Sequence, residues 1–195
     1  VVSLRAQSVP GRHPISGREY ARPMGVAGAP WLERAEREQE ERPTRAIEIM
    51  KVTAGMSVAD IGAGSGYFTE RLARLVGPQG RVYASDIQQG MLDLIQQRVL
   101  RERLGNVTLI LGEPANPKLP EAALDLALMV DVYHELSDPQ TVLGHIRRAL
   151  KPTGRLVLIE YKGEDPTIPI IPSHKMTVAQ AKLEVEHEGF MLATA

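Results

Sequence analysis

The stretch from Val58 to Phe68 holds the residues whose types and spacing best support chemistry. It reads as a short apolar strand carrying Asp60, followed by glycines at alternate positions, Gly62, Gly64 and Gly66. A backbone that turns sharply against a ligand needs glycine, because a Cβ would clash there and φ can be positive. A helix that begins after this loop presents unpaired N–H groups, which suit a polar or anionic ligand. The stretch therefore predicts a ligand-binding loop.

Two further acidic residues lie at the ends of predicted strands. Asp86 ends an apolar segment at 82–86, and Asp131 directly follows another at 124–130. In an open α/β sheet the ligand lies beyond the carboxyl ends of the strands, where the strand order reverses. A single acid at such a place could simply cap the next helix. Three acids at strand ends, with Asp60 among them, favour one shared binding site.

The elements that must position these residues alternate along the chain. The pattern predicts strands at 57–61, 82–86, 107–111, 124–130 and 154–161, and helices at 67–76, 88–104 and 139–150. Short apolar strands that alternate with helices are typical of a parallel sheet covered on both faces. We therefore expect an α/β fold with a doubly wound, mainly parallel sheet.

The segments before this region have a different character. Residues 1–30 are rich in Gly, Pro and Arg and predict an irregular arm. Residues 31–51 mix Glu and Arg and predict a solvated helix, broken near Pro43. A second helix from about Thr44 is expected to bury four apolar side chains. These are Ala46, Ile47, Ile49 and Met50. We divide the chain into an arm with a charged helix at 1–43 and a ligand-binding domain at 44–195.

Four segments in this order resemble motifs of the class I S-adenosylmethionine-dependent methyltransferases. They are residues 58–68, 81–87, 124–135 and 150–160. The resemblance covers roughly residues 45 to 190 and implies a Rossmann-like fold of seven strands, the last two antiparallel. Residues 176–188 would be the helix before the sixth strand, and residues 190–192 the start of that strand. We expect a C-terminal truncation, or strands supplied by another chain. The open edge at 156–159 could then form a homodimer.

The resemblance implies a role for each residue of the cofactor half. Asp60 and the glycine loop would approach the methionine part of S-adenosylmethionine, with the Asp60 carboxylate facing its ammonium group. Asp86 would accept hydrogen bonds from both ribose hydroxyls, as the acid of dinucleotide sites does, and Ile87 would pack on the adenine. Four further residues are considered for the same site. They are Glu113, which could pair with the adenine amino group or be a solvated loop residue, Met91, which core packing explains better, and Val130 and Asp131, which would close the site.

The same resemblance makes the loop at 132–135 the acceptor edge. His134 could take a proton from an acceptor near neutral pH, or it could only shape the pocket. Methyl transfer is an in-line displacement with a neutral leaving group, so alignment and exclusion of water can suffice. Four residues could form a lid, although a structural or surface role explains them better. They are Tyr20, Trp31, His174 and Lys175. We expect a small-molecule acceptor.

Composition excludes several other classes. The formal net charge of −1 leaves no electrostatic footprint for nucleic acid. The absence of cysteine excludes disulfides, a thiol nucleophile and the cysteines that arsenite methyltransferases use. The spacing of His13, His145 and His187 predicts no metal site. No apolar run is long enough to span a membrane. The cytoplasm is the expected compartment, or export if residues 1–7 are the tail of a signal peptide.

Two alternatives stay open at this point. The chain could be a non-catalytic cofactor-binding or regulatory module on the same fold, which the missing C-terminal strands favour slightly. It could also be a nicotinamide-dependent oxidoreductase. The dinucleotide pattern is G-x-G-x-x-G, however, and Tyr67 stands where its third glycine would be.

Overall fold

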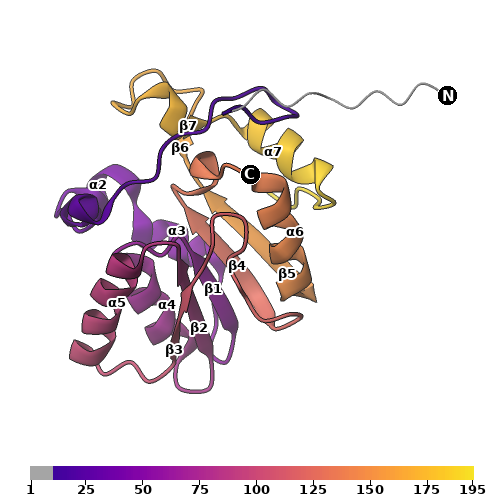
Figure 1. The fold of residues 1–195 in the computed structure, drawn as a ribbon. Coiled ribbons are helices and arrows are strands. Elements are labelled where there is room, and N and C mark those ends of the chain that lie inside the picture. Colours follow the sequence, from indigo (N-terminus) through magenta and orange to yellow (C-terminus); the bar gives the residue numbers. More distant parts are fainter. Residues whose placement is uncertain (1–10) are drawn as a thin grey trace.

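The sheet is the framework of the molecule. The computed structural model describes residues 11–195, so the predicted signal-peptide remnant lies outside the described residues. Five parallel strands pair in the order β3-β2-β1-β4-β5. Their bounds are Ser57–Ile61 for β1, Arg81–Asp86 for β2, Val107–Leu111 for β3, Leu124–Val130 for β4 and Leu150–Ile159 for β5. The predicted doubly wound parallel sheet is confirmed (Figure 1).

Helices cover both faces of this sheet. Helices α3 (Pro43–Met50), α4 (Tyr67–Val76) and α5 (Gln89–Arg101) pack on one face, and α6 (Pro139–Ala149) and α7 (Val178–His187) pack on the other (Figure 1). Side chains alternate along a strand, so Val58 joins the apolar cluster on the α4 side while Ala59 joins the cluster on the α6 side. Within residues 11–195, no helix combines the length and the apolar character needed to cross a bilayer.

The charged segment before the sheet is more broken than predicted. It forms η1 (Val26–Gly28), α1 (Ala29–Leu32), α2 (Arg37–Glu41) and then α3. The predicted break lies at Arg42, whose φ of 52° is left-handed, and Pro43 then starts α3, where its missing N–H has no cost. The predicted burial of Ile49 is wrong. Its side chain is 59% exposed on the outer face of α3, while the neighbouring Met50 is buried.

The C-terminal part departs from the sequence expectation at one point. The predicted helix is present as α7, but the predicted strand at 190–192 is wrong, because the chain is irregular after the helix. Phe190 packs against the apolar cluster on the α6 side, and Met191 points into solvent. Strand β5 is the last strand of the sheet on this side. A separate parallel pair, β6 (Tyr161–Lys162) and β7 (Lys175–Met176), follows it.

An N-terminal arm, residues 11–25, runs across the carboxyl edge of the sheet and contacts α7 (Figure 1). The Arg18 guanidinium donates to Glu184 of α7 with Nε 2.9 Å from Oε1, and it donates to the backbone oxygen of His134 at 2.9 Å. Glu184 is fully buried. A buried charge is costly unless it is paired and hydrogen-bonded, so this ion pair holds the arm in one position over the sheet edge.

Leucine-to-alanine substitutions should separate the core from the surface. Leu128 of β4 is fully buried in the cluster on the α4 side, so Leu128→Ala should lower the free energy of unfolding by about 2–5 kcal/mol. Leu100 of α5 is 69% exposed, and Leu100→Ala should change it by less than about 0.5 kcal/mol. Urea denaturation of both variants measures the difference. Equal effects of the two substitutions would contradict this core.

Candidate functional site

A cavity of about 680 Å³ opens at the carboxyl edge of the sheet. The glycine loop after β1, the ends of β2 and β4, the N-terminal arm and the segment 169–174 all line it. Strand β1 lies between β2 and β4, so this is the point where the strand order reverses and where ligands of open α/β sheets bind. Apart from Asp60 and Gly66, every site residue predicted from the sequence lines the cavity.

The glycine loop and Asp86 are joined directly. Gly62 and Gly64 have φ values of 67° and 54°, which side chains rarely adopt. A Cβ at Gly62 would lie 2.5 Å from Cγ2 of Val132, and one at Gly64 would lie 2.9 Å from Cδ1 of Leu32. The backbone N–H of Gly64 donates to Oδ2 of Asp86 at 2.9 Å. The second oxygen of this carboxylate accepts from the N–H of Gln88 at 2.9 Å.

Asp60 and Gly66 lie behind the cavity wall. Asp60 is buried, and its Oδ2 accepts a hydrogen bond from the Thr69 hydroxyl at 2.6 Å. Burial raises the pKa of Asp60 to about 6, although the bond from Thr69 opposes the shift. Gly66 has a φ of 82° at the start of α4, and a Cβ there would meet the side chain of Ile95 at 3.1 Å. Both residues therefore support the glycine loop from the buried side of the cavity wall.

The residues after β2 and β3 form one end of the cavity. Ile87 is 45% exposed and lines the cavity. Glu113 pairs with Lys118, with Oε1 2.6 Å from Nζ, and its side chain is 61% exposed. Met91 of α5 is buried and also borders the cavity. This end therefore offers an apolar surface with an acid at its rim.

Asp131 directly follows β4 and lines the cavity. Its φ of 54° is left-handed, and its N–H donates to the backbone oxygen of Ile159 at 2.8 Å. Burial raises the pKa of Asp131 to about 7, helped by repulsion from Glu160 and Glu41. Within residues 11–195, the side chain of Asp131 has neither a hydrogen bond nor a salt bridge. A carboxylate that borders a cavity without a hydrogen bond or salt bridge can pair with a positively charged group of a ligand.

The other end of the cavity is built around a series of ionisable side chains that contact one another. His134 lies in the short helix η2 (Tyr133–Glu135) and is buried. Its Nδ1 is 2.5 Å from Oε2 of Glu160, and its Nε2 is 3.2 Å from Nδ1 of His174 in η3 (Pro172–His174). Burial lowers the pKa of His134, but the hydrogen bond and charge of Glu160 outweigh it, so the pKa lies above its usual value. Burial raises the pKa of Glu135 to about 7.

Several residues that line the cavity or contact its lining residues escaped the sequence analysis. Glu160 follows β5 directly, so the rule that selected Asp86 and Asp131 could have selected it too. Arg37 and Tyr161 meet at Glu41, whose oxygens accept from the arginine Nε at 2.6 Å and from the tyrosine hydroxyl at 2.7 Å. No local sequence pattern marks Arg37, Tyr161 or Glu41, because their contact joins α2 to β6, which are far apart in the sequence.

The four residues considered for a lid have different positions. Tyr20, Trp31 and His174 line the cavity. Trp31 of α1 also packs against a charge, because the Arg34 guanidinium lies 3.7 Å from its ring centroid. Lys175 does not line the cavity, and its Nζ donates to the backbone oxygens of Asp165 and Ile168. Lys175 therefore has the structural role that the sequence favoured for all four residues. The other three fit that role less well, because they line the cavity.

Comparison with known proteins identifies the domain. Residues 58–154 match a family model described as a methyltransferase domain. A ubiquinone/menaquinone biosynthesis C-methyltransferase UbiE of Hahella chejuensis (strain KCTC 2396) is 32% identical over 126 residues, which are 64% of this chain and 50% of the relative. A demethylmenaquinone methyltransferase of Geobacillus sp. (strain WCH70) is 34% identical over 111 residues, 57% of this chain and 47% of the relative. The chain spans about half the length of these two relatives.

A solved structure agrees with these matches. A SAM-dependent methyltransferase from Aquifex aeolicus has a TM-score of 0.80 and 28% sequence identity. The match covers 86% of this chain and 89% of that protein. The predicted resemblance is therefore confirmed, and the chain belongs, through the domain at residues 58–154, to the class I S-adenosylmethionine-dependent methyltransferases.

Proposed function

We propose that the protein transfers a methyl group from S-adenosylmethionine to a small-molecule acceptor. One observation carries the proposal: the glycine loop with Asp86 and the acceptor loop with His134 open on the same cavity. A cofactor held at the first end would have its reactive methyl directed toward the second. A cavity of about 680 Å³ falls within the range that holds a small-molecule ligand.

The residues of the first end fit S-adenosylmethionine. Gly62 and Gly64 form a cradle that side chains would fill. Asp86 borders the cavity, where its carboxylate could accept hydrogen bonds from the ribose hydroxyls, and Ile87 offers an apolar surface to the adenine. The carboxylate of Asp131, which has no side-chain partner within residues 11–195, would face a positively charged group of the cofactor. Asp60 is enclosed by the Thr69 contact, so any effect it has on the ammonium group would pass through the loop.

When bound, S-adenosylmethionine supplies an electrophilic methyl group on a sulfonium, and its leaving group is a neutral thioether. The protein then has two tasks, which are alignment and exclusion of water. The N-terminal arm serves the second task, because its residues from Tyr20 to Met24 line the cavity. The hydrogen bond between His134 and Glu160 fixes the orientation of the imidazole at the acceptor end. A proton released by an acceptor could move to the histidine pair at this end.

The acceptor end is mainly apolar outside its ionisable groups. Leu136, Val142 and the segment 169–171 line it. The names of the relatives suggest C-methylation of a quinone precursor as one candidate reaction for this chain, and an apolar wall suits such a ring. A panel of phenolic, amine and quinol acceptors, assayed with methyl-labelled S-adenosylmethionine, tests this choice.

Two alternatives predict different binding data. A nicotinamide-dependent oxidoreductase would bind NAD, and a non-catalytic module would bind the cofactor but methylate nothing. Calorimetric titration with S-adenosylhomocysteine, with NAD in parallel, separates the first alternative from our proposal. Micromolar binding of S-adenosylhomocysteine alone supports the proposal, and binding of NAD alone would overturn it.

Three broader predictions remain with this proposal. We expect no nucleic-acid partner, because the net charge is close to zero. We expect the outer edge of β5 to be the contact if the chain forms a homodimer, because edge strands pair readily. We expect the cytoplasm as the compartment, since the cofactor is available there.

A valine at Gly64 should abolish cofactor binding. The new side chain would enter the cavity beside Leu32 from a backbone with φ of 54°, so it would displace both the ligand and the loop. Gly55→Val is the matched control, because Gly55 also has a positive φ, of 84°, but lies in open space. Titration with S-adenosylhomocysteine compares the two. Unchanged affinity of Gly64→Val would show that the loop has another role.

Removal of the Asp86 carboxylate should weaken cofactor binding by about 1.5–3 kcal/mol, because hydrogen bonds to a charged group are lost. This corresponds to a rise in Kd of roughly 10- to 150-fold for Asp86→Ala. Asp93→Ala, an exposed site on α5, should leave the Kd unchanged. A change of less than about tenfold for Asp86→Ala would remove this residue from the ribose site.

Cofactor binding should tighten as the pH rises from 6 to 8. Asp131 has a pKa of about 7 in the free protein, and only its ionised form can pair with a positive group. Binding therefore competes with protonation below this pKa, and the affinity at pH 6 should be about tenfold weaker than at pH 8. Asp131→Asn should flatten this dependence in S-adenosylmethionine titrations, while Asp93→Asn should retain it. Identical profiles for Asp131→Asn and the unaltered protein would contradict the assignment.

A further inference from the structure

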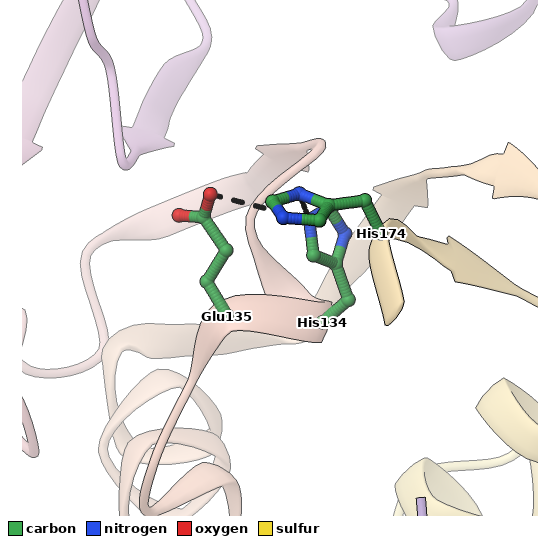
Figure 2. Close-up of side chains that lie close together, drawn as sticks. All are labelled: His134, Glu135 and His174. Atoms are coloured by element: carbon green, nitrogen blue, oxygen red, sulfur yellow. Dashed lines mark hydrogen bonds and ion pairs between the residues drawn. The ribbon is translucent and has the colours of Figure 1, made fainter. Parts of the chain in front are cut away.

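Three potential metal ligands converge at the acceptor end of the cavity. His134 and Glu135 come from η2, and His174 comes from η3 (Figure 2). The ligand atoms of these three side chains all lie within 4.8 Å of one another, and all three residues line the cavity. The grouping could not be predicted from histidine spacing, because the fold alone brings η3 against η2.

His134 is oriented as a metal-binding histidine would be. Its Nδ1 lies 2.5 Å from Oε2 of Glu160, and the other oxygen of Glu160 accepts the N–H of Tyr133 at 2.9 Å. The carboxylate is an acceptor, so the neutral imidazole carries its proton on Nδ1 and directs the lone pair of Nε2 away from Glu160. Metal-binding histidines in proteins have this same support from a carboxylate on the second ring nitrogen.

The second histidine lies at a suitable distance. Nδ1 of His174 is 3.2 Å from Nε2 of His134, and the two rings are inclined by 62°. Two nitrogens that each lie about 2.0–2.1 Å from a tetrahedral zinc ion are roughly 3.3–3.4 Å apart. The pair can therefore receive a cation with little movement. Without one, the same distance fits a hydrogen bond between the rings.

Glu135 completes the set with an oxygen ligand. Its Oε1 is 4.0 Å from Nε2 of His134, so the carboxylate needs to approach by roughly 0.5–1 Å to share a cation. The carboxylate already points toward the two histidines (Figure 2), so a rotation of the Glu135 side chain could supply this movement. Two imidazoles and one carboxylate form a donor set that zinc uses in proteins when a further position stays open. Magnesium prefers oxygen ligands only.

We propose that His134, Glu135 and His174 bind a divalent transition-metal ion of the zinc type, with Glu160 orienting His134. The remaining coordination position faces the cavity, so an oxygen or nitrogen atom of the acceptor can occupy it. This last step rests on the proposed function, whereas metal binding itself does not. The proposal revises the prediction, made from histidine spacing, that the chain has no metal site.

Titration of the untagged, metal-stripped full chain with ZnCl₂ tests the site. We expect one zinc ion per chain by calorimetry and no comparable binding of MgCl₂. Glu160→Gln should weaken zinc binding by about 10- to 100-fold, as loss of such a supporting carboxylate does, and His174→Ala should weaken it at least as much. Co²⁺ in place of zinc should give a visible absorption band that disappears in His174→Ala.

Control variants distinguish this site from other causes. His187→Ala removes an exposed histidine of α7 and should leave zinc binding unchanged. Far-UV circular dichroism and thermal melting verify that each variant is folded, and His174 is suited to this test because it is only half-buried. Absence of stoichiometric zinc binding, or equal binding by His174→Ala and His187→Ala, would overturn the proposal. Titration with S-adenosylhomocysteine in EDTA tests the proposed function separately.

Discussion

The parallel pairing of β1 with both β2 and β4 is the constraint on which the site depends. The register pairs Ile61 with Ser85 on one side and with Met129 on the other, so the three strands end together. Parallel strands run in the same direction, so their carboxyl ends lie at one edge of the sheet. The loops that follow them therefore meet at that edge. The glycine loop, Asp86 and Asp131 share one cavity because of this common end.

The cost of this arrangement is electrostatic. Asp60, Asp86, Asp131 and Glu160 lie at or just beyond strand ends, within a small and largely desolvated region. Burial raises the pKa of the first three because it disfavours the charged form. The structure compensates each acid differently: a hydroxyl for Asp60, backbone N–H groups for Asp86, and an imidazole for Glu160. Among residues 11–195 no such group contacts the carboxylate of Asp131, which leaves it the one most open to a ligand's charge.

The sheet and the cofactor half could be predicted because their signals are local. Apolar runs mark the strands, glycine marks positions with positive φ such as Gly64, and an acid at a strand end marks residues such as Asp86. The acceptor half could not be predicted in this way. His174 reaches His134, and Tyr161 reaches Glu41, only because separate segments fold over the same edge. The strand expected at 190–192 came from family resemblance, and within residues 11–195 no strand lies there to pair with it.

The arm and the short helices give the cavity one wall that is not part of the sheet. Trp31 belongs to this wall, and it is the only tryptophan of the chain. Its indole is held under the Arg34 guanidinium and is 39% exposed. The emission of an indole depends on the polarity of its surroundings and on nearby aromatic groups, so selective excitation of Trp31 reports on the border of the binding site. Occupancy of the cavity can thus be followed optically without any label.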